Sequence, residues 1–185
     1  HIERTIHKGV EPKARVRLLF TGEYDFNREN NYALYSLRDV LNIKLREVVR
    51  EDKSGTYGIR VSASANNIPK ESYQLSISFG CAPDRVDELT QTVHNVLDSV
   101  KTSGIDEKYI SNVQETDLRS FETDLEKNGY WLGKLEQYHR LQWDPKDILT
   151  YPDLVNSLSV EAIQKAAQTY FDGENVAKFI LLPEE

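Results

Sequence analysis

Methionine is absent from this chain of 185 residues, and cysteine occurs once, at Cys81. A single cysteine allows no internal disulfide and no cysteine-based zinc site. The first residue is His1, and the chain opens with neither a methionine nor a signal-peptide pattern. We therefore expect residues 1–185 to be a single domain excised from a longer protein.

Histidine is also scarce, and its spacing argues against a metal site. The chain holds 4 histidines, at His1, His7, His94 and His139. None lies three or four positions from another, and neither an HxxEH nor an HExxH motif occurs. We interpret these residues as packed or surface histidines and predict that this chain binds no metal.

Other function classes are disfavoured by what the sequence lacks. No Gly-x-Ser-x-Gly motif marks a nucleophilic serine, and Cys81 falls on the apolar side of a predicted strand. A net charge of -7 with no basic run argues against a nucleic-acid partner. No apolar run reaches the length of a membrane span. With 39% hydrophobic and 29% charged residues, the composition is that of a globular domain.

The hydrophobic pattern predicts an α+β fold. Val16 to Thr21 forms a short apolar run that ends at Gly22, and a long helix begins at Asn27 or Arg28. Period-two alternation then predicts two paired strands joined by a protruding loop, and helical spacing follows from residue 84 onward. The predicted helices begin near Asp84, Asp106 and Ser159, and the chain closes with a strand over Val176 to Leu182. This order predicts an antiparallel sheet packed against several helices in a two-layer sandwich.

The most informative segment is Leu45 to Ala65, which reads as a helix end, a short glycine-bearing turn and a strand. It brings Arg50 and Tyr57 close to the point where the two elements meet. A guanidinium and a phenol donor together can hold a peptide carbonyl and the oxygen that becomes negative when it is attacked. Structural roles are equally open from these residues alone, since arginine favours a helix C-terminus and tyrosine favours strands. Arg46 is a competing candidate.

The segment KLREVVREDKSGTYGIRVSAS resembles the C-terminal domains of pitrilysin/insulinase-type zinc metallopeptidases, bacterial zinc proteases among them. Those domains end a helix with an "LRE-K-G-Y" pattern whose arginine and tyrosine stand seven positions apart, as Arg50 and Tyr57 do. Arg46 does not fit that spacing. The resemblance extends over nearly the whole chain, including FTGEY in the first strand and the helix around Asp84 to Leu89. It implies the sandwich of the LuxS/processing-peptidase-like type.

The resemblance also implies a division of labour between homologous domains. A zinc-bearing domain in the N-terminal half of the parent carries HxxEH, and a later domain closes over the substrate. By this likeness Arg50 binds a main-chain oxygen of the peptide, and Tyr57 donates a hydrogen bond to the developing oxyanion. The strand from Tyr57 to Ala65 is also expected to offer its edge to an extended peptide.

Two functions remain open at this point. The first is the non-zinc-bearing domain of a zinc metalloendopeptidase, with a zinc-bearing homologous domain and a peptide substrate as partners. The second is an inactive homologue that binds peptide or serves as an assembly scaffold. Without HxxEH the chain is not expected to hydrolyse peptides alone. Related bacterial proteins favour a location in the cell envelope or periplasm.

Overall fold

The structure is a computed structural model that describes residues 1–51 and 56–184. The side chains of residues 50–57 lie outside the described part. The chain divides into two compact units: His1–Ile105 with Val160–Glu185, and Asp106–Ser159. Each unit is described below by itself, and the prediction of one domain over residues 1–185 stays a prediction.

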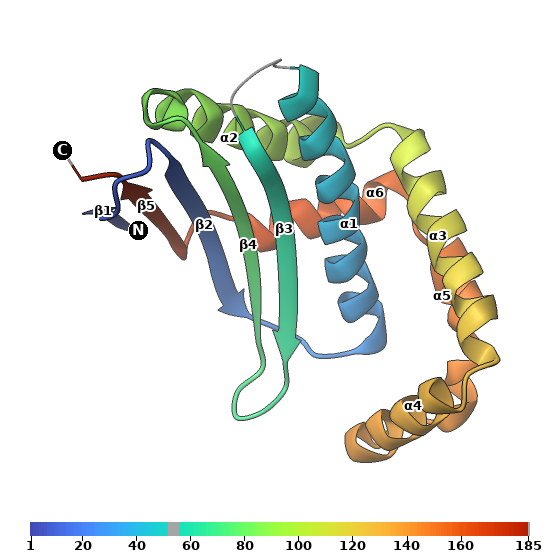
Figure 1. The fold of residues 1–185 in the computed structure, drawn as a ribbon. Helices are drawn as coiled ribbons and strands as arrows, with labels where there is room; N and C mark the ends of the chain where they lie inside the picture. Colours follow the sequence, from blue (N-terminus) through green and yellow to red (C-terminus); the bar gives the residue numbers. More distant parts are fainter. Residues whose placement is uncertain (52–55, 185) are drawn as a thin grey trace. The chain divides into compact units, whose positions relative to one another are not determined.

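The first unit is built on a 5-stranded sheet with the order β1-β5-β2-β4-β3 (Figure 1). Its strands are β1 (Ile2–His7), β2 (Ala14–Glu23), β3 (Thr56–Asn66), β4 (Ser72–Cys81) and β5 (Val176–Leu182). The pairs β2–β4, β2–β5 and β3–β4 are antiparallel, whereas β1 and β5 are parallel. The two end strands are thus β1 and β3.

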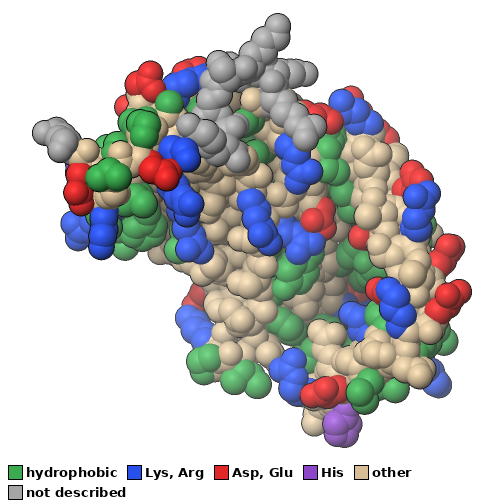
Figure 2. All heavy atoms as spheres, viewed as in Figure 1, with side chains coloured by type: hydrophobic (Ala, Val, Ile, Leu, Met, Phe, Trp, Pro, Cys, Tyr) green, Lys and Arg blue, Asp and Glu red, His purple; other side chains and the backbone are tan. Residues whose placement is uncertain are grey.

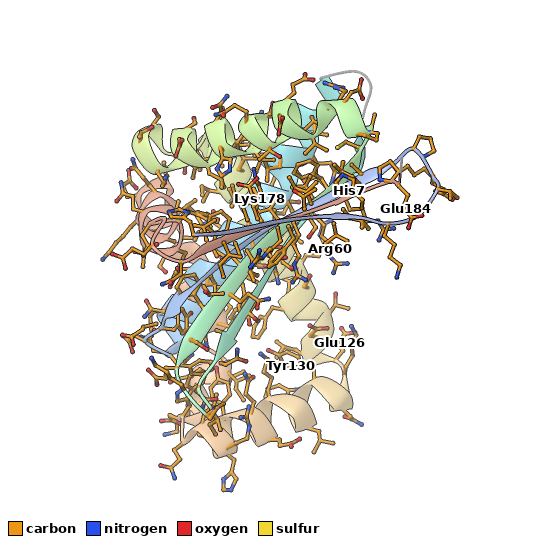
Figure 3. All side chains as sticks on the ribbon, turned by 90° about the vertical axis from the view of Figure 1, so that its left-hand side faces the viewer. His7, Arg60, Glu126, Tyr130, Lys178 and Glu184 are labelled. Atoms are coloured by element: carbon orange, nitrogen blue, oxygen red, sulfur yellow. The ribbon has the colours of Figure 1, made fainter. Side chains whose placement is uncertain are left out.

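Three helices of this unit pack on one face of the sheet and leave the other face without a helix of the unit. They are α1 (Arg28–Glu51), α2 (Val86–Ser103) and α6 (Val160–Tyr170), and a short 3₁₀ turn, η1 (Pro83–Arg85), precedes α2. Figure 3 shows the two faces, with Lys178 on the side of α2 and Arg60 on the opposite side. The two-layer α+β class predicted from the sequence is confirmed, with one parallel pair in an otherwise antiparallel sheet.

The core lies between the sheet and the helices, because the strands under the helices turn an apolar side toward them. Strand β2 alternates buried and exposed residues along Ala14, Arg15, Val16, Arg17 and Leu18. The buried stripe of α1 covers that side with Leu34, Leu37, Leu41 and Leu45, each 0% exposed. A strand with period two and a helix with period 3.6 each bury one face in this way.

Local signals explain where the helices begin and end. The Asn27 side chain accepts a hydrogen bond from the Asn30 amide at 2.7 Å and so caps α1, which begins at Arg28, one of the two starts predicted. Gly104 ends α2 with a φ of 75°, a conformation that glycine adopts without steric cost. Asp84 does not cap α2, because the helix begins one residue after η1 and has Arg85 at its N-cap.

The second unit is helical. It contains α3 (Glu107–Leu125), α4 (Asn128–Leu141), the 3₁₀ turn η2 (Pro145–Ile148) and α5 (Tyr151–Asn156). The Trp131 indole donates to the Leu125 carbonyl at 2.8 Å and so joins α4 to the end of α3. Phe121 packs against Tyr151 with ring centroids 5.3 Å apart. The break predicted at Asn128 is present, and Asp106 caps α3 by accepting from the Lys108 amide.

Two features of the sheet were not predicted. Strand β1 was missed because all its residues are exposed and neither side of it is uniformly apolar. Strand β2 was predicted to end at Gly22 but continues to Glu23. Gly22 pairs with Tyr73, and a Cβ at Gly22 would lie 2.6 Å from the Tyr73 ring. The glycine therefore makes room for a buried aromatic ring and does not end the strand.

Substituting Gly22→Ala is expected to destabilise the protein by about 1–3 kcal/mol, because the added methyl group overpacks against Tyr73. Tyr73 is 4% exposed and donates to the Tyr170 carbonyl at 3.2 Å, so its ring has little room to move. Urea unfolding measures the effect. The matched control is Gly133→Ala, where the new methyl meets nothing within 4 Å. Equal free energies of unfolding for both variants would contradict this role of Gly22.

Candidate functional site

The candidate site predicted from the sequence lies where α1 ends and β3 begins. Arg50 is in the last turn of α1, which ends at Glu51, and Tyr57 is the second residue of β3, which starts at Thr56. The backbone thus brings both residues to one end of neighbouring elements. Their side chains lie outside the described residues, so the contact between them stays a prediction.

The Asn42 side chain joins α1 to β3 through hydrogen bonds. The Asn42 amide nitrogen donates to the Val61 carbonyl at 2.9 Å, and the Val61 amide donates to Asn42 Oδ1 at 2.8 Å. The second hydrogen of the Asn42 amide bonds to the Arg38 carbonyl at 3.0 Å. Asn42 lies eight positions before Arg50, and Val61 lies four positions after Tyr57. We call this pair of bonds the Asn42 bracket; it sets helix and strand in register next to the candidate site.

The bracket bears on the expected addition of a peptide to this strand. Strand β3 is at the edge of the sheet, where backbone groups are open to pairing. At Val61, however, both backbone groups are already bonded to Asn42. A peptide that paired with the middle of β3 would have to displace the carboxamide. Pairing along the remainder of the strand stays a prediction.

The backbone of β3 is irregular at the predicted site. The register with β4 shifts between Thr56 and Gly58, which places the irregularity at Tyr57. Gly58 has a φ of 132°, in the region that favours glycine. Bulges of this kind are over-represented next to active sites. The irregularity is a second observation, independent of the residue spacing, that favours the start of β3 as a site.

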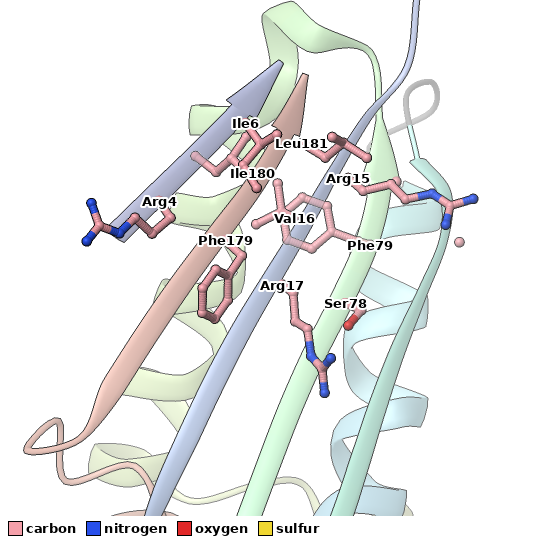
Figure 4. Close-up of a pocket in the computed structure, with 12 residues that line it drawn as sticks. Arg4, Ile6, Arg15, Val16, Arg17, Ser78, Phe79, Phe179, Ile180 and Leu181 are labelled. Carbon is pink, nitrogen blue, oxygen red and sulfur yellow. The ribbon is translucent and has the colours of Figure 1, made fainter. Parts of the chain in front are cut away.

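The sheet face without helices of the first unit, here called the open face, carries a hollow of about 590 Å³ (Figure 4). Its side chains come from four adjacent strands, and the figure shows Phe179 between Arg4 and Arg17. Its lining includes Arg4, Ile6, Arg15, Arg17, Ser78, Phe179 and Leu181. Figure 2 shows Lys and Arg side chains over the strands and hydrophobic side chains at the β1–β5 end. Sequence reasoning missed this surface, since β1 was not recognised.

The remaining chemically active groups have structural surroundings. Cys81 is buried, and burial raises the pKa of its thiol, with Asp84 adding to the rise. Burial lowers the pKa of His94, which favours the neutral imidazole. Among residues 1–51 and 56–184, no three His, Cys, Asp or Glu side chains form a metal-binding group. None of the helices within the described residues is long and apolar enough to cross a membrane.

Comparison with known proteins supplies a family. A family model described as the peptidase M16 inactive domain matches residues 1–116. The probable zinc protease PqqL of Haemophilus influenzae is 26% identical over 166 residues, which are 85% of this chain and 18% of that protein.

Solved structures show the same fold. The periplasmic protease PqqL from Escherichia coli matches with a TM-score of 0.84 and 24% identity over 99% of this chain and 20% of that chain. The ferredoxin protease FusC in complex with Arabidopsis ferredoxin matches with a TM-score of 0.85 and 20% identity, over 100% and 20% of the two chains. This chain spans about a fifth of the length of these relatives.

Replacing Asn42 with alanine is expected to lower the free energy of unfolding by about 1–3 kcal/mol, because both Val61 backbone groups lose their partner. Hydrogen exchange at the Val61 amide should accelerate as well. Asn95→Ala is the matched control, since Asn95 is exposed on α2 and accepts a hydrogen bond from Gln91, a side chain of the same helix. Unchanged exchange at Val61 in the Asn42 variant would show that the bracket does not hold the strand.

Proposed function

Because the chain belongs to the peptidase M16 inactive-domain family, we propose that it acts as the non-zinc-bearing domain of a zinc metalloendopeptidase. The family assignment confirms the resemblance to pitrilysin/insulinase-type zinc proteases. The chain covers about a fifth of the two PqqL proteins, which supports a role as one domain of a longer protein. In this role it closes over the substrate chamber and meets a zinc-bearing homologous domain.

One observation carries the proposal. The backbone brings the end of α1 and the start of β3 together under the Asn42 bracket, with Arg50 and Tyr57 at that end. A cation that stays protonated and a phenol donor fit the two oxygens of a peptide under attack. We assign Arg50 to a main-chain oxygen of the substrate and Tyr57 to the oxyanion.

Zinc belongs to the other domain in this proposal. The parent's N-terminal half would hold the ion, which activates the attacking water when bound. The tyrosine hydroxyl of this chain would donate a hydrogen bond where negative charge develops, and the arginine would orient the peptide. A periplasmic location is proposed from the Escherichia coli PqqL structure, which is named a periplasmic protease.

In the intact parent, Tyr57→Phe is expected to lower kcat by about 10²–10³, the usual effect of removing one oxyanion donor. The phenyl ring keeps its volume, so zinc content and melting temperature should stay the same. Peptide hydrolysis, metal analysis and thermal unfolding measure the three quantities. An unchanged kcat would remove Tyr57 from the mechanism and favour the alternative of an inactive peptide-binding or scaffold domain.

Arg50→Ala in the same protein is expected to raise KM by about tenfold or more, because a charged hydrogen bond to the peptide is lost. Arg46→Ala is the matched control: Arg46 is exposed one turn earlier on α1 and is assigned no contact with substrate. A fall in melting temperature with an unchanged KM would make Arg50 a structural residue.

A further inference from the structure

The open face carries a row of residues that runs straight across the sheet. The pairing of strands aligns Arg4 with Phe179, Phe179 with Arg17, Arg17 with Ser78, and Ser78 with Arg60. Arginine therefore occurs on every second strand. Neighbouring strands lie about 4.8 Å apart, so successive arginines of the row are separated by roughly 10 Å at the backbone. We call Arg4, Arg17 and Arg60 the arginine row.

Arg15 and an apolar group flank the arginine row. Leu181 pairs with both Ile6 and Arg15. It lies two residues after Phe179 on β5, at the next position on the same face. Phe179 and Leu181 are 38% and 37% exposed, and Ile6 is 58% exposed. Together these side chains line the hollow of the open face. The surface therefore combines cations with apolar contact area.

The arginines of the row are not neutralised by ion pairs within the described part of the chain. Arg4, Arg17 and Arg60 are exposed, and none forms an ion pair with a described carboxylate. By contrast, Glu3 and Lys178, on the opposite side of β1 and β5, bind each other at 2.6 Å. Exposed cations that pair with no described carboxylate of their own domain are available to an external anion.

Carboxylates are nearly absent from this face, although the chain as a whole has a net charge of -7. Of the described strand residues that alternate onto it, Glu23 carries a negative charge, and it is paired with Lys70 at 2.7 Å. Glu23 lies six positions from Arg17, or about 20 Å along the strand. Glu11, in the loop before β2, is paired with Lys13 at 2.9 Å. The face is therefore locally positive on an acidic protein.

We propose that the arginine row binds an acidic segment of the peptide substrate, which makes this domain selective for substrates with carboxylates about three residues apart. The proposal rests on the proposed function, because it treats the open face as a substrate surface. In an extended polyproline II conformation, every third side chain returns to the same side after about 9.3 Å. That repeat is close to the spacing of the arginine row. Phe179, which lies between Arg4 and Arg17 in the row, would contact the aliphatic parts of the side chains that carry the carboxylates.

The test uses the intact parent and two peptides that share one cleavable sequence. One carries a flanking Glu-x-x-Glu-x-x-Glu segment, and the other carries glutamine at those three positions. Three exposed ion pairs predict about a 5- to 30-fold preference in kcat/KM for the acidic peptide. The preference should shrink at high salt, because the arginines are exposed.

The double variant Arg17→Gln/Arg60→Gln should reduce this preference to within about twofold, because kcat/KM for the acidic peptide falls more than kcat/KM for the glutamine peptide. Lys165→Gln is the control for loss of one positive charge: Lys165 is exposed on α6, away from the open face, and should keep the preference. A wild-type enzyme that treats both peptides alike would overturn the proposal. Equal losses for both peptides in the double variant would also overturn it.

Direct binding separates this proposal from the proposed function. Fluorescence anisotropy of the labelled acidic and glutamine peptides reports affinity whether or not either peptide is cleaved. Selective binding of the acidic peptide, together with an unchanged kcat in the Tyr57→Phe variant, would support the arginine row and refute the catalytic role of the domain. Equal affinity for both peptides, in wild type and in the double variant, would refute the arginine row. A lowered kcat in the Tyr57→Phe variant would then still support the catalytic role of the domain.

Discussion

The pleat of a single sheet governs everything else in the first unit. Successive side chains of a strand point to opposite faces, so a strand that lies under the helices supplies apolar residues at every second position. Val16 and Leu18 do so on β2, and Leu75 and Ile77 do so on β4. The intervening positions are thereby free of any packing requirement. Those are the positions at which Arg17 and Ser78 lie, so the core and the proposed binding surface are two consequences of one alternation.

A second constraint concerns the edge of that sheet. An edge strand exposes unpaired backbone groups, which makes its position and its pairing poorly defined. The carboxamide of Asn42 resembles a peptide group, and it pairs with Val61 on both sides as a neighbouring strand would. These bonds occupy the backbone groups at the middle of the edge strand β3, and they also hold α1 against that strand. The roles proposed for Arg50 and Tyr57, at the adjoining ends of α1 and β3, would require such a fixed support because catalytic geometry tolerates little movement.

The helices and strands could be predicted from the sequence more readily than the pairing between strands. Alternation located β3 and β4, and helical spacing located α1 and α2, because each of these buries one regular face. Strand β1 has no such face, and its partner β5 lies at the other end of the chain, so pairing between residues 2–7 and 176–182 left no local signal. The arginine row depends on that pairing. Arg50 and Tyr57 could be proposed as a pair because their spacing is contained within one short segment, and their roles stay a prediction.

The acidity of the whole chain and the basic character of the open face are compatible. At physiological ionic strength, charges separated by more than about 8 Å of solvent are largely screened. A peptide on the open face therefore interacts with the arginines beside it far more strongly than with carboxylates on the outer surfaces of the helices. The net charge of -7 describes how the protein behaves at a distance, whereas the residues within one screening length determine what it binds. The excess of acidic residues over the chain thus gives no reason to expect a basic substrate at this face.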